Sequence, residues 1–253
     1  MYIVTRMLNP VPAEELDSFE QRHAVTLPRS YRGWLGTYGE GTYSGWMNIQ
    51  GPDAEVLKPF AEYDFWLHDE EAPISQEQIG ECISIGSSVD GDFLAIHSGV
   101  AGLLWLPRHD ERIRLWHDME EGFGEQLNRI YSDVYSDASL AEPRYFEPWN
   151  ELRQHTFYHY AGAKQGGLSL QEVAQVFKAR FEWDAILENQ HTCKLFSASM
   201  GGYLRFNYAY GSEIALFYEA GTKAGGAPET EIDRVLQEHD CKAINPMGAE
   251  ESY

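Results

Sequence analysis

Side chains that could bind a metal ion gather at three places in the sequence. His155 and His159 are four residues apart and would share one face of a helix. The runs from His68 to Glu71 and from His117 to Glu121 each join one histidine to three carboxylates, and imidazole and carboxylate groups are common metal ligands. Two histidines alone rarely form a site, and adjacent acids in a loop are usually solvated. We therefore expect no metal site.

Motifs of the common catalytic sites are missing from the sequence. It contains no His-Glu-x-x-His, no Gly-x-Ser-x-Gly, no phosphate-binding Gly-x4-Gly-Lys-Ser/Thr and no zinc-spaced cysteines. The segment Asp90-Gly91-Asp92 is typical of a turn, because aspartate tolerates left-handed backbone and bonds to the local chain. We expect a protein that is not an enzyme and has no cofactor. An enzyme whose paired carboxylates come from distant parts of the chain is the alternative.

The sequence is strongly acidic, with 40 acidic residues, 19 lysines and arginines, and a net charge of −21. Residues 1–140 carry a net charge of −15 and residues 141–253 a net charge of −6. A field of this sign repels nucleic acids and anionic membranes and speeds association with basic proteins. The charge predicts a basic protein partner, no nucleic acid and no membrane, and solubility alone is the competing explanation.

Composition is typical of a folded cytoplasmic protein. Hydrophobic residues make up 43% of the chain, which suffices for a core, and no apolar run approaches the ~20 residues of a membrane helix. The N-terminal residues do not resemble a signal peptide. Cys82, Cys193 and Cys241 are far apart and odd in number, so we expect free thiols in a reducing compartment. The oligomeric state is left open.

The segment from Thr26 to Gly41 predicts a short helix with an aromatic face. Pro28 is suited to a helix start, and Tyr31, Trp34, Leu35 and Tyr38 follow at positions that share one face. Gly39 and Gly41 then suit a helix end followed by a strand. Trp46, Trp66, Trp105 and Trp116 could line a ligand groove, but aromatic residues near short strands more often form the core, which we expect here.

Short motifs follow one another in order over about residues 8 to 135. They are Leu16, Phe19 and Glu20; Leu27-Pro28; Tyr31 and Leu35; Tyr38-Gly39-Glu40-Gly41; Gly51-Pro52; Ile85-Gly86; and Asp90-Gly91-Asp92 with Phe93-Leu94. Their order and spacing resemble the SUKH superfamily, whose best-known branch contains a yeast cell-wall-assembly regulator and many bacterial immunity proteins. The resemblance implies an α+β domain that binds partners, in which motif residues such as Tyr31 and Gly39 serve the fold.

The remaining pattern of the first half agrees with an antiparallel sheet flanked by helices, the α+β class. We expect helices over 10–23, from Asp53 toward Trp66, and over 123–134, and strands over 42–49, 82–85, 93–97, 103–106 and 113–116. Residues 1–138 would form this SUKH-like domain, with a Pro-containing connector over 136–148.

A smaller α+β unit is predicted over residues 139–253. Ser169 and Glu172 match a capping box, so a helix should begin there, and a second should run from Pro228 to His239. Three strands should lie between them, over 193–199, 203–209 and 213–219. Residues 149–160 could form a helix or a strand.

The resemblance and the charge together predict an immunity protein that neutralises a basic toxin, such as a nuclease, by binding it. The expected contact residues are acids on exposed loops of the first domain. They are Asp69, Glu70, Glu71, Asp90, Asp92, Glu120 and Glu121. One alternative is a regulatory scaffold that binds signalling or cell-wall partners, as the yeast relative suggests. The other is an enzyme with a site between the two halves.

Overall fold

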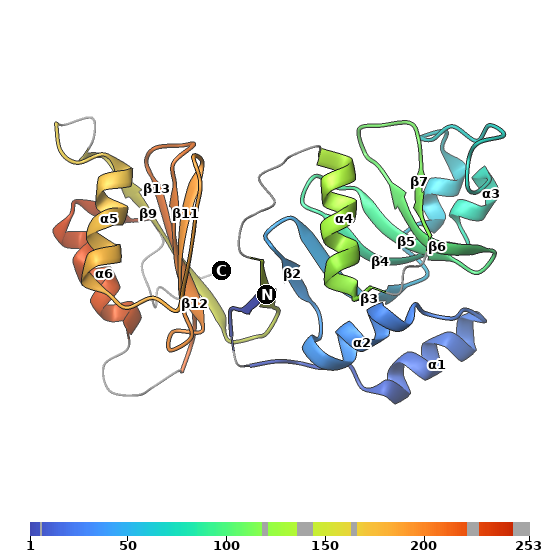
Figure 1. Ribbon diagram of the computed structural model, residues 1–253, viewed down its shortest axis with the longest axis horizontal. Helices are drawn as coiled ribbons and strands as arrows, with labels where there is room; N and C mark the ends of the chain where they lie inside the picture. Colours follow the sequence, from blue (N-terminus) through green and yellow to red (C-terminus); the bar gives the residue numbers. More distant parts are fainter. Residues whose placement is uncertain (6, 118–120, 136–143, 163–165, 222–227, 245–253) are drawn as a thin grey trace, which may run out of the picture. The chain divides into compact units, whose positions relative to one another are not determined.

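The computed structural model describes the protein except for residues 6, 118–120, 136–143, 163–165, 222–227 and 245–253 (Figure 1). The described chain forms two units. The first unit spans Leu8–Trp149, and the second unit combines Met1–Met7 with Asn150–Tyr253. Each unit contains helices and an antiparallel sheet, so the predicted α+β class is confirmed.

An antiparallel sheet forms the centre of the first unit. Its strands are β2 (Gly41–Tyr43), β3 (Met47–Asp53), β4 (Ile83–Ser88), β5 (Phe93–His97), β6 (Val100–Leu106), β7 (Arg114–Trp116) and β8 (Tyr145–Pro148). They follow the order β8-β2-β3-β4-β5-β6-β7, and each neighbouring pair is antiparallel. The helices are α1 (Ala13–His23), α2 (Arg29–Tyr38), α3 (Gln76–Ile79), α4 (Phe123–Tyr135) and the 3-10 helix η1 (Lys58–Glu62).

Helix α2 lies between Pro28 and Gly39, as its sequence predicts, and of the predicted face Tyr31, Trp34 and Leu35 are buried while Tyr38 is half-buried. The Tyr31 hydroxyl donates a hydrogen bond to the backbone carbonyl of Gln50 in β3. The Trp34 ring packs edge-on against Phe146 of β8, with ring centroids 5.0 Å apart. Burial raises the pKa of Tyr31 well above its usual range, so the hydroxyl stays protonated and keeps its bond. The helix therefore joins two strands through the core.

The helix predicted from Asp53 toward Trp66 is wrong. Strand β3 extends to Asp53, and the chain then enters the short helix η1. The Asp53 carboxylate accepts backbone hydrogen bonds from Glu55 and Val56 at 2.6 and 3.1 Å, which stabilise a turn. Pro59 lies within η1 and prevents the hydrogen-bonding pattern of a longer α-helix.

Helix α3 was not predicted, although its sequence carries a capping box. The Ser75 hydroxyl accepts a hydrogen bond from the Gln78 backbone at 3.4 Å, and the Gln78 side chain accepts one from the Ser75 backbone at 2.8 Å. The helix has four residues. A hydrophobic period cannot be recognised over so short a stretch, so the cap was the available signal.

The division between the units differs from the predicted boundary after residue 138, which falls outside the described residues. The chain divides after Trp149, and the first seven residues group with the second unit. Part of the predicted connector is strand β8, whose Phe146 is paired with Tyr43 of β2. Phe146 and Tyr145 are buried. Two prolines suggested a linker, but both the pairing and the burial depend on contacts about 100 residues away in sequence.

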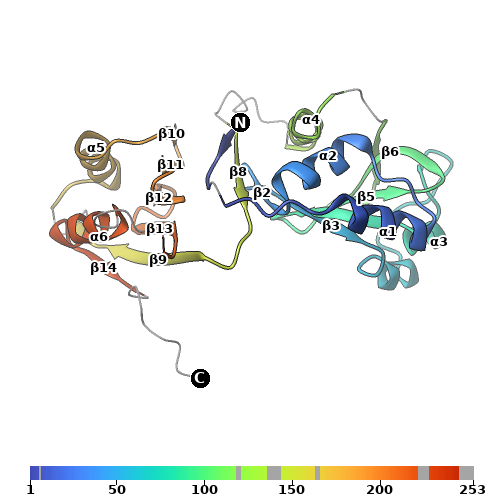
Figure 2. The ribbon, with the colours of Figure 1, turned by 90° about the horizontal axis from the view of Figure 1, so that it is seen from below.

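The second unit is a sheet with two helices on one face (Figures 1 and 2). Its strands are β9 (Arg153–Tyr160), β10 (Ala185–Glu188), β11 (Thr192–Ser197), β12 (Gly202–Asn207), β13 (Glu213–Glu219) and β14 (Cys241–Ala243), in the order β10-β11-β12-β13-β9-β14. Helices α5 (Leu170–Arg180) and α6 (Pro228–Glu238) pack on it through a core that includes Phe177, Leu204 and Leu236. The three predicted strands are β11 to β13, and the sheet gains β9, β10 and β14.

The tryptophans considered as a ligand groove lie mostly in the core. Trp46, Trp66 and Trp105 are buried and Trp116 is half-buried, so the first three belong to the core, as expected.

Of the helices in the described ranges, none is long and apolar enough to cross a membrane.

Candidate functional site

Three of the predicted contact acids lie in an exposed loop that precedes α3. Arg112 lies 3.2 Å from the Asp69 carboxylate and 3.6 Å from that of Glu71, and Glu70 is exposed. Because Arg112 offsets part of the negative charge, this loop is less acidic than its sequence suggests.

The turn Asp90-Gly91-Asp92 separates its two acids. Asp92 is buried, at 6% exposure, and accepts hydrogen bonds from the Arg108 backbone at 2.9 Å and the Ser88 hydroxyl at 2.5 Å. Asp90 is exposed and accepts one from the Tyr135 hydroxyl at 3.1 Å. The prediction of Asp92 as a surface contact is therefore corrected, because its carboxylate is used to hold the turn.

The last two predicted contact acids come before α4. Glu120 falls outside the described residues. Glu121 is exposed and borders a hollow of about 990 Å³ that is also lined by Arg29 and His97. This hollow is not dominated by negative charge, so it is a weaker candidate for a basic partner than the groove described next.

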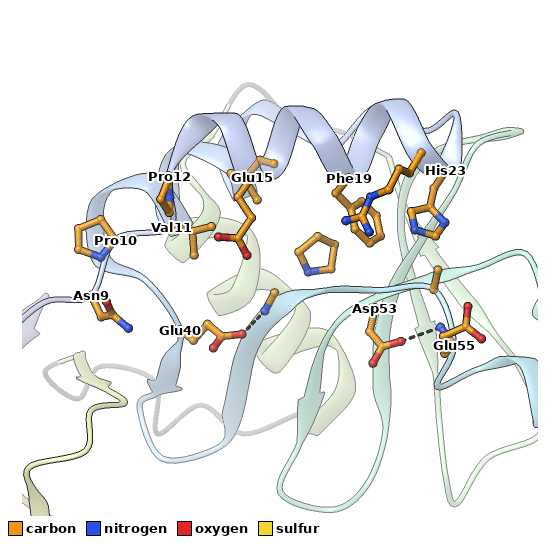
Figure 3. Close-up of a pocket in the computed structure, with 15 residues that line it drawn as sticks. Asn9, Pro10, Val11, Pro12, Glu15, Phe19, His23, Glu40, Asp53 and Glu55 are labelled. Atoms are coloured by element: carbon orange, nitrogen blue, oxygen red, sulfur yellow. Dashed lines mark hydrogen bonds between the residues drawn. The ribbon is translucent and has the colours of Figure 1, made fainter.

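A groove of about 720 Å³ lies between helix α1 and strand β3 (Figure 3). Helix α1 lines it with Glu15, Leu16, Phe19, Arg22 and His23, whose spacing places them on one face. The other lining residues are Asn9, Pro10, Val11, Pro12, Glu40, Gly51, Pro52, Asp53, Ala54 and Glu55. We call it the α1–β3 groove.

Carboxylates outnumber cations in the α1–β3 groove. Glu15, Glu40, Asp53 and Glu55 line it, against Arg22 and the titratable His23. Figure 3 shows the Glu15 side chain reaching from α1 toward the strand side, where Glu40 lies. A second hollow, of about 380 Å³, shares Glu40 and Asp53 with the groove. The negative surface therefore continues past β3.

Apolar side chains accompany these carboxylates. Leu16 and Phe19 are buried, and the Phe19 ring stacks on that of His23 with centroids 4.4 Å apart. Pro52 adds a rigid apolar surface on the strand side. The groove thus combines negative charge with an apolar wall, a combination that suits the long methylene chain and charged end of lysine or arginine.

Backbone bonds hold two of the carboxylates in place. Glu40 accepts a hydrogen bond from the backbone N–H of Gly51, and Asp53 accepts those of Glu55 and Val56. Their positions are set by the main chain of β3 and its following turn. A partner group would meet oriented acceptors, which reduces the entropy lost on binding.

An ion-pair network fixes α1, the other wall, against α2. Arg32 pairs with Glu20, and its other guanidinium nitrogen lies 2.6 Å from Asp17. Glu20 also accepts the backbone N–H of Leu27 at 2.7 Å. Helix α1, which forms this wall of the groove, is therefore held in position against α2, because Arg32 of α2 pairs with both Asp17 and Glu20 of α1.

Residues of several of the short sequence motifs meet in this groove. Leu16, Phe19, Glu40, Gly51 and Pro52 all line it, although they come from three separate motifs. The resemblance to the SUKH superfamily assigns such motif residues to the fold. Glu15 and Glu55 belong to none of these motifs, and Asp53 was expected only as the start of a helix. The residue spacing in the sequence is enough to recognise one face of α1, but it does not show that this face lies opposite β3.

The histidine pair considered as a metal site lies on a strand. His155 and His159 are exposed residues of β9, and a strand separates positions four apart by about 13 Å. A helix would have brought the two imidazoles together. In the part of the chain that the structure describes, no group of three or more His, Cys, Asp or Glu side chains is placed to hold a metal ion.

Comparisons with protein families, with curated proteins and with solved structures found no match to this chain.

Proposed function

We propose that this protein binds and neutralises a basic protein partner, in the manner of an immunity protein of the cytoplasm. The observation that carries the proposal is the α1–β3 groove, where Glu15, Glu40, Asp53 and Glu55 meet beside an apolar wall. The partner would place a lysine- or arginine-rich segment there.

The overall charge supports the same partner. The chain carries a net charge of −21, and a strong field of one sign speeds encounter with an oppositely charged protein while the local fit determines how long the complex lasts. The volume of about 720 Å³ is within the range of ordinary ligand clefts, about 300–1,000 Å³. It would accommodate a few side chains of a partner rather than a whole domain.

Two further observations agree with this proposal. The motifs that resemble the SUKH superfamily lie in the first unit, and five of their residues line the groove. Cys82, Cys193 and Cys241 are free and buried, as is usual for proteins of a reducing compartment. A toxin with a basic substrate-binding surface, such as a nuclease, is the partner that these features suit.

The proposal can be tested with the full chain as bait in a pull-down from its source cells at increasing salt. Recovered proteins would be identified, purified and titrated against the bait. We expect a basic protein whose activity is inhibited on binding and whose affinity falls about tenfold or more when salt screens the charges. Recovery of envelope or signalling proteins whose binding does not respond to salt would instead favour a regulatory scaffold.

A further inference from the structure

An exposed aromatic edge follows helix η1 in the first unit. Tyr63, Phe65 and Leu67 are exposed to 57%, 53% and 43%, although all three are large and apolar. Trp66 between them is buried, at 5%. Of the four large apolar side chains over 63–67, only that of Trp66 therefore enters the core. We call Tyr63, Phe65 and Leu67 the aromatic edge.

Ring contacts make the edge continuous with the core beneath it. The Phe65 ring lies 5.7 Å from that of Tyr63 and 5.6 Å from that of Phe60, measured between centroids. Phe65 also contacts Trp66, at 5.9 Å, and the Trp66 indole donates a buried hydrogen bond to the Pro107 carbonyl at 2.8 Å. The exposed rings therefore rest on an anchored tryptophan.

The backbone of the edge is held in place from two sides. The Gln76 side-chain amide donates to the carbonyl oxygens of Phe60, Ala61 and Tyr63, at 3.3, 2.9 and 2.7 Å. The Leu67 backbone N–H donates to the Glu111 carbonyl at 2.8 Å. Rings displayed on a fixed backbone lose little entropy when a partner covers them, which is a property of energetically important interface residues.

Acidic residues alternate with the exposed rings. Glu62, Asp64 and Glu70 are exposed, as are Asp69 and Glu71, which share Arg112, and all five lie within residues 62–71. An aromatic face attracts a cation, arginine most often, and a neighbouring carboxylate can bind the same guanidinium. Two copies of this surface would bring like charges together, which disfavours self-association through it.

We infer that the aromatic edge is a second contact surface for the basic partner and that it binds arginine side chains of that partner. This inference rests on the proposed function and adds a chemical preference to it. The groove attracts any long cation. The edge distinguishes arginine from lysine, because the planar guanidinium stacks on the rings and also bonds to the adjacent carboxylates.

Two labelled peptides test the inference: one alternates arginine with glycine, and the other carries lysine in place of arginine. Binding to the full chain would be followed by fluorescence anisotropy. We expect tighter binding of the arginine peptide. The double variant Tyr63→Ala/Phe65→Ala should lower its affinity about fivefold or more and bring it to that of the lysine peptide, since each ring contributes a cation–π contact. Phe65→Leu keeps the apolar volume and should lose part of the preference.

Control variants separate this inference from the proposed function. Tyr210→Ala removes a ring that is 78% exposed in the second unit and should leave both affinities unchanged. Glu15→Gln in the groove should weaken both peptides equally. If groove variants weaken binding and edge variants do not, the edge inference fails and the proposed function stands. If neither weakens binding, both fail. Loss of a dimer in sedimentation of the edge variant would also overturn the inference, because the edge would then bind a second copy.

Discussion

Gly39 lies so close to Asn9 that a Cβ atom added to the glycine would come within 2.1 Å of the Asn9 carbonyl oxygen. The backbone of Gly39 has φ of +76° and ψ of −161°, a region that essentially only glycine populates. This contact places the segment before α1 against the end of α2. One end of the α1–β3 groove depends on it, since Asn9 is a lining residue.

Substitution of Gly39 by valine should therefore destabilise the first unit. Steric overlap with Asn9 and the unfavourable φ act together, and we expect a loss of about 2–4 kcal/mol in the free energy of unfolding. Gly36→Ala is the matched control, because this glycine lies in α2 with nothing within 4 Å of an added Cβ. The Gly36→Ala variant should gain about 0.5–1 kcal/mol in the free energy of unfolding. Urea unfolding of both variants provides the measurement, and equal midpoints would contradict the argument.

A pair of neighbouring acids on α1 tests the groove as the binding site. Glu15 lines the groove, whereas Glu14 is exposed on the same first turn and is not among its lining residues. Glu15→Gln should weaken binding of the basic partner by about 0.5–1 kcal/mol, as expected for one partly screened charge, and Glu14→Gln should change it much less. Both replacements remove one charge near the same helix start, so a nonspecific effect would weaken binding equally in calorimetric titrations.

Removing the buried carboxylate of Asp92 should affect folding rather than binding. Asp92→Ala leaves the backbone N–H of Arg108 and the hydroxyl of Ser88 without their acceptor, and we expect a loss of about 1–3 kcal/mol in the free energy of unfolding. Glu70→Ala, in an exposed loop, should leave stability within about 0.5 kcal/mol of the parent. If Asp92→Ala had a native melting temperature and reduced partner affinity, its assignment to the turn would be wrong.

Three buried thiols make the stability sensitive to alkaline pH. Burial raises the pKa of Cys82 to about 12, that of Cys193 to about 11 and that of Cys241 to about 12, from an ordinary value of 9.0. Above pH 9 the unfolded chain releases these protons while the folded protein keeps them, so folding stability should fall as pH rises toward 11. Unfolding curves recorded from pH 8 upward measure this trend.

Reaction with a thiol reagent gives an independent reading of the same burial. Native protein at pH 8 should react slowly at all three cysteines, because the thiolate is the reactive form and is disfavoured in the core. Urea-unfolded protein should react rapidly. Fast labelling of the native protein would show that a thiol is accessible.

Local pattern and composition determined much of this structure. The aromatic spacing in α2, the capping box of α5 and the short apolar runs of β4 to β7, separated by turn residues, each specify their element within a few residues, because these signals are local. The net charge likewise comes from composition and predicts a basic partner without any fold. These inferences needed no knowledge of distant contacts.

Tertiary structure decided where the chemistry lies. Strand pairing made the His155–His159 segment a strand rather than a helix and added Tyr145–Pro148 to the first sheet. Hydrogen bonds buried Asp92, although its sequence is that of an exposed turn. The α1–β3 groove collects Glu15, Glu40 and Asp53 from separate elements. Local sequence can specify a helix or a turn, but the position of one carboxylate relative to another depends on packing between residues far apart in the chain.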